Sequence, residues 1–200
     1  MTNNKPVILI LAAGMASRMG CVKQLLSYHG KSLLQRSIEN AQATGLSVIV
    51  VLGAYINQIR PLVESYGVMY VINKQWRKGI STSIHAGVNW ALEHKPDLNG
   101  IIITLPDQPY ITSAHLSSIL EATENNADII ATEYQGVSGV PAYFSRKYLE
   151  ELKKLKGDTG ARALIKNWPG SVFSISFPAA ALDIDTEQDW KDFIERRNEY

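Results

Sequence analysis

Residues 8–23, ILILAAGMASRMGCVK, are the stretch that decides the fold class of this chain. The apolar run over residues 7–11 is typical of a strand buried on both faces of a parallel sheet. It is followed by Ala12, Ala13 and Gly14, whose small side chains leave the backbone open to a ligand, and then by the cations Arg18 and Lys23. A buried strand, a small-residue loop and two cations predict a cradle for a polyphosphate. The same residues also fit a plain turn between a strand and a helix, with both cations in solvent.

Apolar runs alternate with helical patterns along the rest of the chain. Further strands are expected at residues 47–52, 68–72, 100–105, 127–132 and 171–177. Such strand–helix units with short connections predict a Rossmann-like three-layer α/β sandwich with a mostly parallel sheet. No linker or repeat interrupts the pattern, so residues 1–200 are expected to form one domain.

Two prolines and one asparagine give local expectations. Asn57 is expected to cap the helix after the second strand, which would place Pro61 early in that helix. Pro141 predicts that the segment after the fifth strand is an edge strand or a loop, because proline cannot donate to a strand ladder.

Composition limits the kind of partner. Twenty Lys and Arg against 19 Asp and Glu give a formal net charge of +1, which provides no overall field to attract nucleic acid or an anionic membrane. The single cysteine, Cys21, excludes an internal disulfide and fits a reducing compartment. No signal-peptide pattern is expected at the N-terminus, and no apolar run approaches the roughly 20 residues of a membrane span. We therefore expect a cytoplasmic protein with neither a nucleic-acid nor a membrane partner.

Two groups of carboxylates are candidates for metal binding. Asp107 lies between two prolines after the apolar run at 100–105, and Asp183 and Asp185 flank Ile184 near the C-terminus. Two carboxylates beside a polyphosphate suit Mg²⁺, which prefers oxygen ligands and shares those of the phosphates. Asp107 could instead close a turn or cap a helix, and the later pair could simply precede a helix. With a metal in place, Arg18 and Lys23 would stabilise charge on the α-phosphate and the leaving pyrophosphate.

Other catalytic classes find little support. The histidines show no ligand spacing, and no Ser/His/Asp or Cys/His set indicates a protein nucleophile. Gly14 and Gly20 do not give the GxGxxG spacing of a dinucleotide-binding oxidoreductase. Nucleotidyl transfer needs no protein nucleophile when the acceptor is itself a phosphate or a hydroxyl.

Ordered motifs along nearly the whole chain resemble those of the molybdenum cofactor nucleotidyltransferases, in particular their cytidylyltransferase branch, within the GT-A-like NTP-transferase superfamily. The matching segments are LAAG at 11–14, RMG at 18–20, KQLL at 23–26, GISTSI at 79–84, LPDQP at 105–109, GVP at 139–141 with Phe144, GD at 157–158 with GAR at 160–162, and DIDT at 183–186.

The resemblance implies a Mg²⁺-dependent enzyme that transfers CMP from CTP to molybdopterin and releases pyrophosphate. Arg18, Lys23 and Asp107 would be its catalytic residues. The loop from Ala12 to Gly14 would hold the triphosphate together with Arg18 and Lys23, and Asp107 and Asp185 would hold the metal. The remaining nucleotide contacts implied near the base or ribose are Gly53, Gly79 and Ser81, and the segments at Gly139 and 158–162 would face the acceptor.

Three positions qualify the resemblance. Ala13 replaces a glycine usual in guanylyl-transferring relatives, which favours CTP over GTP. Ala16 stands where the family often has serine, and Val140 where it commonly has histidine or another polar residue, so the acceptor contact differs.

Alternatives are transfer from GTP, a sugar or polyol phosphate acceptor, or a non-catalytic carrier that hands a nucleotide cofactor to a molybdoenzyme. The presence of Arg18, Lys23 and Asp107 favours an enzyme, because a carrier of product needs no triphosphate site.

Overall fold

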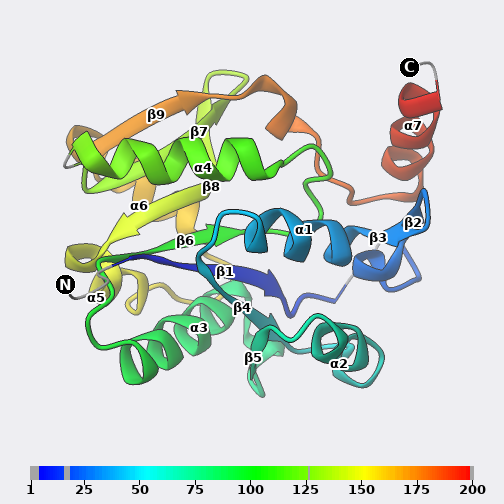
Figure 1. Ribbon diagram of the computed structural model, residues 1–200, viewed down its shortest axis with the longest axis horizontal. Coiled ribbons are helices and arrows are strands. Elements are labelled where there is room, and N and C mark those ends of the chain that lie inside the picture. Colours follow the sequence, from blue (N-terminus) through cyan, green and yellow to red (C-terminus); the bar gives the residue numbers. More distant parts are fainter. Residues whose placement is uncertain (1–4, 16–18, 126, 199–200) are drawn as a thin grey trace.

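The central feature of the fold is a seven-stranded sheet with the order β5-β4-β1-β6-β8-β7-β9 (Figure 1). The computed structural model describes residues 5–15, 19–125 and 127–198. Strands β1, β4, β5 and β6 are mutually parallel, β8 runs antiparallel to both of its neighbours, and β9 is parallel to β7. The expected α/β architecture with a mostly parallel sheet is confirmed. The strands are β1 (Val7–Ala12), β4 (Ser47–Leu52), β5 (Met69–Ile72), β6 (Gly100–Thr104), β7 (Ile129–Tyr134), β8 (Val137–Ser145) and β9 (Val172–Ser176), with a small separate hairpin of β2 (Ser27–Tyr28) and β3 (Lys31–Ser32).

Helices cover both faces of the sheet. They are α1 (Leu33–Gln42), α2 (Ile56–Ser65), α3 (Ile80–His94), α4 (Ser113–Ala122), α5 (Leu149–Leu152), α6 (Ala161–Asn167) and α7 (Glu187–Asn198). Alternate residues of β1 point to opposite faces, so Leu9 packs with α3, α5 and α6 while Ile10 packs with α1, α2 and α4. All six residues of β1 are buried, as the apolar run predicts. None of the helices in the described part of the chain is long and apolar enough to cross a membrane.

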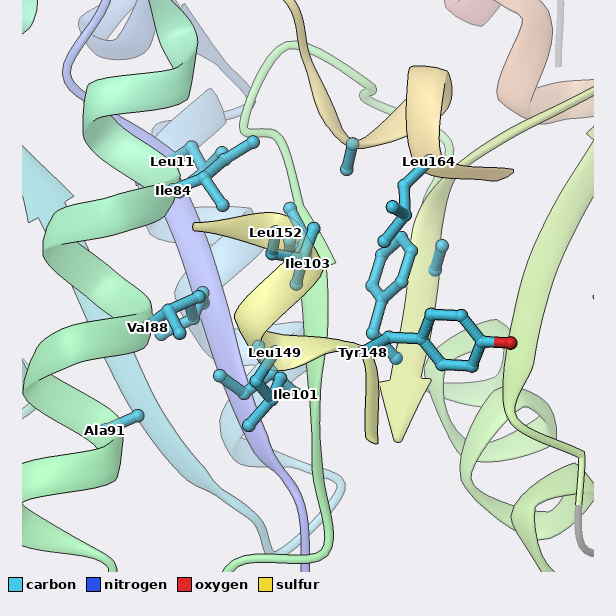
Figure 2. Close-up of a cluster of buried hydrophobic side chains, with 14 of the residues drawn as sticks. Leu11, Ile84, Val88, Ala91, Ile101, Ile103, Tyr148, Leu149, Leu152 and Leu164 are labelled. Carbon is cyan, nitrogen blue, oxygen red and sulfur yellow. The ribbon is translucent and has the colours of Figure 1, made fainter. Parts of the chain in front are cut away.

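Figure 2 shows the core on the α3 face of the sheet. Ile84 and Val88 of α3 point toward Leu11 of β1 and toward Ile101 of β6, and Tyr148 and the short α5 extend the same layer. This packing, with the approach of Gly87 to Leu9 and Val51, fixes α3 against β1 and β4. The start of α3 is therefore held beside the carboxyl ends of these two strands.

The last helix packs away from the main sheet. In Figure 1, α7 and the β2–β3 hairpin lie at the end of the molecule toward which the arrow of β1 points. Phe193 of α7 is buried in a cluster with Met19, Leu33 and Ile184, and its ring meets the ring of Tyr28 edge-on. The chain just before α7 is thereby brought to the carboxyl edge of the sheet.

One strand prediction was wrong. The segment containing Pro141 is neither an edge strand nor a loop but part of β8, which lies between β6 and β7. Pairing with β6 stops at Ala142, and the register with β7 shifts between Ala131 and Thr132, which are paired with Ala142 and Gly139. Pro141 falls in this irregularity, so its missing N–H breaks no ladder bond.

The helix-start prediction was also wrong. Tyr55 precedes α2 and its carbonyl accepts from the backbone N–H groups of Gln58 and Ile59, so Asn57 lies inside the first turn. Pro61 consequently lies within the helix. It is on the exposed side, where losing one backbone hydrogen bond is tolerated.

Candidate active site

A cleft of about 360 Å³ opens at the carboxyl ends of β1 and β6. Its walls come from the loop after β1, from the 3₁₀ turn Lys23–Leu25, from the start of α3 and from the segment after β6. Ala13, Gly14, Lys23, Gly79 and Asp107 line it, so five of the expected site residues meet at one place. This is the edge at which parallel α/β sheets bind ligands.

Lys23 joins the two expected metal ligands. Its Nζ lies 2.5 Å from Oδ2 of Asp107 and 2.9 Å from Oδ1 of Asp185. The side chains of Lys23 and Asp107 are 15% and 14% exposed, whereas that of Asp185 is 51% exposed. Burial lowers the pKa of Lys23, but the charge and hydrogen bonds of Asp107 and then of Asp185 outweigh it and hold the pKa above its ordinary value. Lys23 is therefore charged at neutral pH.

Backbone and side-chain hydrogen bonds fix the segment that carries Asp185. The N–H of Ile184 donates to the carbonyl of Asp107 at 2.9 Å. The carboxylate of Asp189 accepts from the N–H of Asp185 at 3.1 Å and from the N–H of Thr186 at 2.8 Å, while the Thr186 hydroxyl accepts from the N–H of Asp189 at 3.1 Å. The reciprocal Thr186–Asp189 pair has the pattern of a capping box. Asp185 is thus held by α7 itself.

Asp183 lies in the same group of acids. Desolvation, and then the nearby charges of Asp107 and Asp185, raise the pKa of Asp183 to about 6. Asp183 therefore lies close to the charges of Asp107 and Asp185, and of the two later acids it is Asp185 that contacts the Lys23 ammonium.

The loop after β1 is held from behind. Gln24 is buried, and its Nε2 donates to the carbonyl of Gly14 at 3.2 Å. Gly53 is also behind the loop, because a Cβ placed there would lie 2.6 Å from the carbonyl oxygen of Ala13 and 2.9 Å from Cβ of Trp76. Gly53 therefore supports the loop and is absent from the cleft lining, and Ala12 is likewise covered.

Gly79 and Ser81 make the opposite wall. Gly79 has φ 104° and ψ 169°, and an ideal Cβ there would lie 2.2 Å from the carbonyl carbon and oxygen of Gly157. The N–H of Ser81 donates to the same Gly157 carbonyl at 3.2 Å. Ser81 is 1% exposed and does not line the cleft, whereas Ser83, two residues further along α3, does. This contact also brings Asp158 into the cleft, although the sequence placed it on the acceptor side.

One aromatic and one cationic residue of the cleft were not predicted from the sequence. Trp76 and Arg77 line the cleft, and the Arg77 guanidinium lies 4.2 Å from the centre of the Trp76 ring. The only signal was the basic, unpatterned stretch at residues 73–80. Arg18, predicted to be the second phosphate-binding cation, lies outside the described residues.

The donor atoms fit a hard divalent cation that shares phosphate ligands. Oδ1 of Asp107 is buried and has no hydrogen-bond partner in the described part of the chain. Asp107 and Asp185 already gather around one positive charge. The described residues contain no group of three or more His, Cys, Asp or Glu that could hold a metal alone. An ion held by these two carboxylates would need further oxygen ligands from a substrate, as Mg²⁺ usually does.

A second groove of about 470 Å³ lies between the β7–β8 turn, α6 and β9. Arg162 and Lys166 of α6 and Ser138 of β8 line it, so the 158–162 segment contributes to both hollows. Gly139 is buried, and a Cβ there would lie 2.4 Å from the Tyr134 hydroxyl oxygen. The carbonyl of Val140 accepts from Nε2 of Gln108 at 3.2 Å, so this position contributes its backbone to the packing.

Three known proteins are similar in sequence to this protein over nearly the whole of its chain. PucB, a purine catabolism protein of Bacillus subtilis (strain 168), is 29% identical over 94% of this chain and 95% of its own length. The nicotine blue oxidoreductase of Paenarthrobacter nicotinovorans is 28% identical over 89% and 91%. The molybdenum cofactor cytidylyltransferase of Escherichia coli (strain K12) is 28% identical over 96% of both.

A solved structure and a protein family are also similar to this chain over most of its length. Rv0371c of Mycobacterium tuberculosis H37Rv, crystallised in complex with manganese, superposes with a TM-score of 0.75 and 26% identity over 96% of this chain and 98% of that one. The family described as MobA-like NTP transferase domain matches residues 8–172, which contain the whole cleft lining. Because this match spans most of the chain, the protein belongs to the MobA-like NTP transferase domain family.

Proposed function

We propose that this nucleotidyltransferase-family protein moves CMP from CTP to molybdopterin, with release of pyrophosphate and with Mg²⁺ as the metal. The observation that carries the proposal is the meeting of Lys23, Asp107 and Asp185 at one side of the cleft. A cation and two carboxylates beside an open small-residue loop suit a substrate that brings a chain of phosphates and a divalent ion. We further propose that residues 1–200 act as one catalytic domain.

The residues of the chain would act by binding and by placing charge. The exposed backbone at Gly14 and Met15 would hold the phosphates, and Lys23 and Arg77 would place positive charge beside them. An oxygen of the acceptor phosphate forms a bond to the α-phosphorus, the bond from that phosphorus to the bridging oxygen breaks, and pyrophosphate leaves with the electron pair. Asp107 and Asp185 would hold Mg²⁺, which when bound offsets the negative charge of the phosphates.

Three features support the choice of substrates. The E. coli cytidylyltransferase resembles this chain along its full length. Ala13 stands where guanylyl-transferring relatives usually carry glycine, and we take this difference to favour CTP. The groove at Arg162 and Lys166 offers two cations for an anionic acceptor. The product would then pass to a molybdoenzyme.

The test is pyrophosphate release from CTP and from GTP, each with and without molybdopterin, at fixed Mg²⁺. The proposal predicts release only with CTP and molybdopterin together. Release with GTP, or with a sugar or polyol phosphate as acceptor, would keep the chemistry and overturn the substrate assignment. Nucleotide binding without any release would favour a cofactor carrier, and no nucleotide binding at all would overturn the assignment as a transferase.

A further inference from the structure

The position of the Lys23 ammonium is unusual for a residue expected to bind phosphate. Its Nζ is directed at two carboxylates, Asp107 at 2.5 Å and Asp185 at 2.9 Å, which come from the middle of the chain and from its C-terminal part. The cluster is largely enclosed on the Lys23–Asp107 side, where both side chains are about one-seventh exposed, at 15% and 14%. Lys23 is therefore the counter-ion that holds the two acids together in the protein without ligands.

A divalent ion held by Asp107 and Asp185 conflicts with this arrangement. Mg²⁺ approaches carboxylate oxygens to about 2.0–2.1 Å, and an ammonium that contacts the same oxygens would face it as a like charge at close range. Lys23 must leave Asp185 and Oδ2 of Asp107 before these atoms can serve a metal. Of the two carboxylate oxygens of Asp107, Oδ1 is buried and accepts no hydrogen bond within the described residues.

The released ammonium needs another anion. Lys23 is itself a lining residue of the cleft, beside Gly14 and Arg77. Without a ligand, a displaced Lys23 would be a partly buried charge with no partner, which is unfavourable. With a triphosphate in the cleft it would exchange two carboxylates for phosphate oxygens.

We propose that Lys23 couples metal binding to nucleotide binding: it occupies the Asp107–Asp185 pair in the free protein and transfers to the phosphates when a nucleoside triphosphate enters. The divalent ion then binds productively only together with the nucleotide. This inference rests on the proposed function. By linkage, the nucleotide tightens metal binding by the same factor as the metal tightens nucleotide binding.

The test measures Mn²⁺ binding by the decrease of the free-ion electron paramagnetic resonance signal, with and without α,β-methylene CTP. Wild-type protein should bind Mn²⁺ weakly alone and at least about tenfold more tightly with the nucleotide. Lys23→Met keeps the length of the side chain without its charge. It should bind Mn²⁺ alone at least about tenfold more tightly than wild type, and the effect of the nucleotide should shrink.

Arg77→Met is the matched control, because Arg77 lines the same cleft and its guanidinium lies over the Trp76 ring. If only the electrostatic field matters, both variants raise the Mn²⁺ affinity of the free protein alike; displacement predicts the rise for Lys23→Met alone. Equal effects of the two variants, or equal Mn²⁺ affinity of wild type with and without nucleotide, would overturn the inference. The wild-type comparison decides the matter if Lys23→Met does not fold.

The two proposals fail in different ways. Pyrophosphate release from CTP with uncoupled Mn²⁺ binding would leave the proposed function standing and overturn the coupling. Absence of nucleotide binding to wild-type protein would overturn both.

Discussion

Gly79→Ala tests how the wall of the cleft is built. Gly79 has φ 104° and ψ 169°, a region that is essentially restricted to glycine and costs other residues about 1–3 kcal/mol. The added methyl group would also lie 2.2 Å from the Gly157 carbonyl and 2.6 Å from the Asp158 nitrogen. Both neighbours are backbone, so no side chain can rotate away. Backbone displacement adds to the conformational cost, and we expect a total loss of about 3–5 kcal/mol in the free energy of unfolding.

Two further glycines separate these contributions. Gly157 has φ +59° and nothing within 4 Å of an added Cβ, so Gly157→Ala should show the conformational cost alone, about 1–2 kcal/mol. Gly170 has neither a positive φ nor a close neighbour, so Gly170→Ala should stay within about 0.5 kcal/mol of wild type. The measurement is urea unfolding followed by circular dichroism, with the free energy extrapolated to water. If Gly79→Ala is no less stable than Gly157→Ala, the close approach of α3 to the 157–158 turn is wrong.

Three further predictions concern single side chains. Asp107→Asn keeps the shape but removes the charge, so metal-dependent pyrophosphate release should fall by about 100-fold or more with unchanged circular dichroism, and near-normal turnover would contradict the metal role. Asp189→Ala removes the acceptor for the N–H groups of Asp185 and Thr186 and should lower the free energy of unfolding in urea by about 1 kcal/mol. Asp189→Asn retains an acceptor oxygen, so an equal loss in that variant would contradict the capping explanation. Burial lowers the pKa of His115 from 6.5 to about 4, so the unfolded chain binds more protons between these values and stability falls as pH decreases through this window. The loss should reach about 3 kcal/mol near pH 4, and a stability difference between wild type and His115→Gln that does not vary with pH would refute it.

The sequence predicted the parts of the fold that follow from local pattern. The apolar runs at β1 and β4 are local signals, and the structure confirms both. Pro141 was misplaced because the rule against proline in central strands assumes regular pairing, and the register shift in β8 removes that assumption. Asn57 was misplaced because α2 begins where Ile59 and Val63 can be buried, and this tertiary preference outweighs the choice of capping residue.

The site was predicted as a set of residues but not as an arrangement. Gly14, Lys23 and Asp107 could be proposed from their places after two buried strands, because the carboxyl ends of such strands meet at one sheet edge. Gly79 was proposed from the family resemblance. The supporting role of Gly53 could not, since it depends on the approach of Trp76 from a later segment. Trp76 and its neighbour Arg77 carry no periodic pattern, so only the folded chain brings them into the cleft.

The pairing of Lys23 with Asp185 shows why the rest needed a structure. The two residues are 162 positions apart, and their contact depends on how α7 docks. Phe193 anchors that helix in the cluster with Ile184, and the backbone of Ile184 in turn bonds to Asp107. Hydrophobic packing of the last helix thus sets the distance between two acids, and that distance decides whether one ammonium can bridge them. The proposed metal site is in this sense built by α7, which is why changes at Asp189 or in the Phe193 cluster should reach the proposed chemistry without touching the cleft.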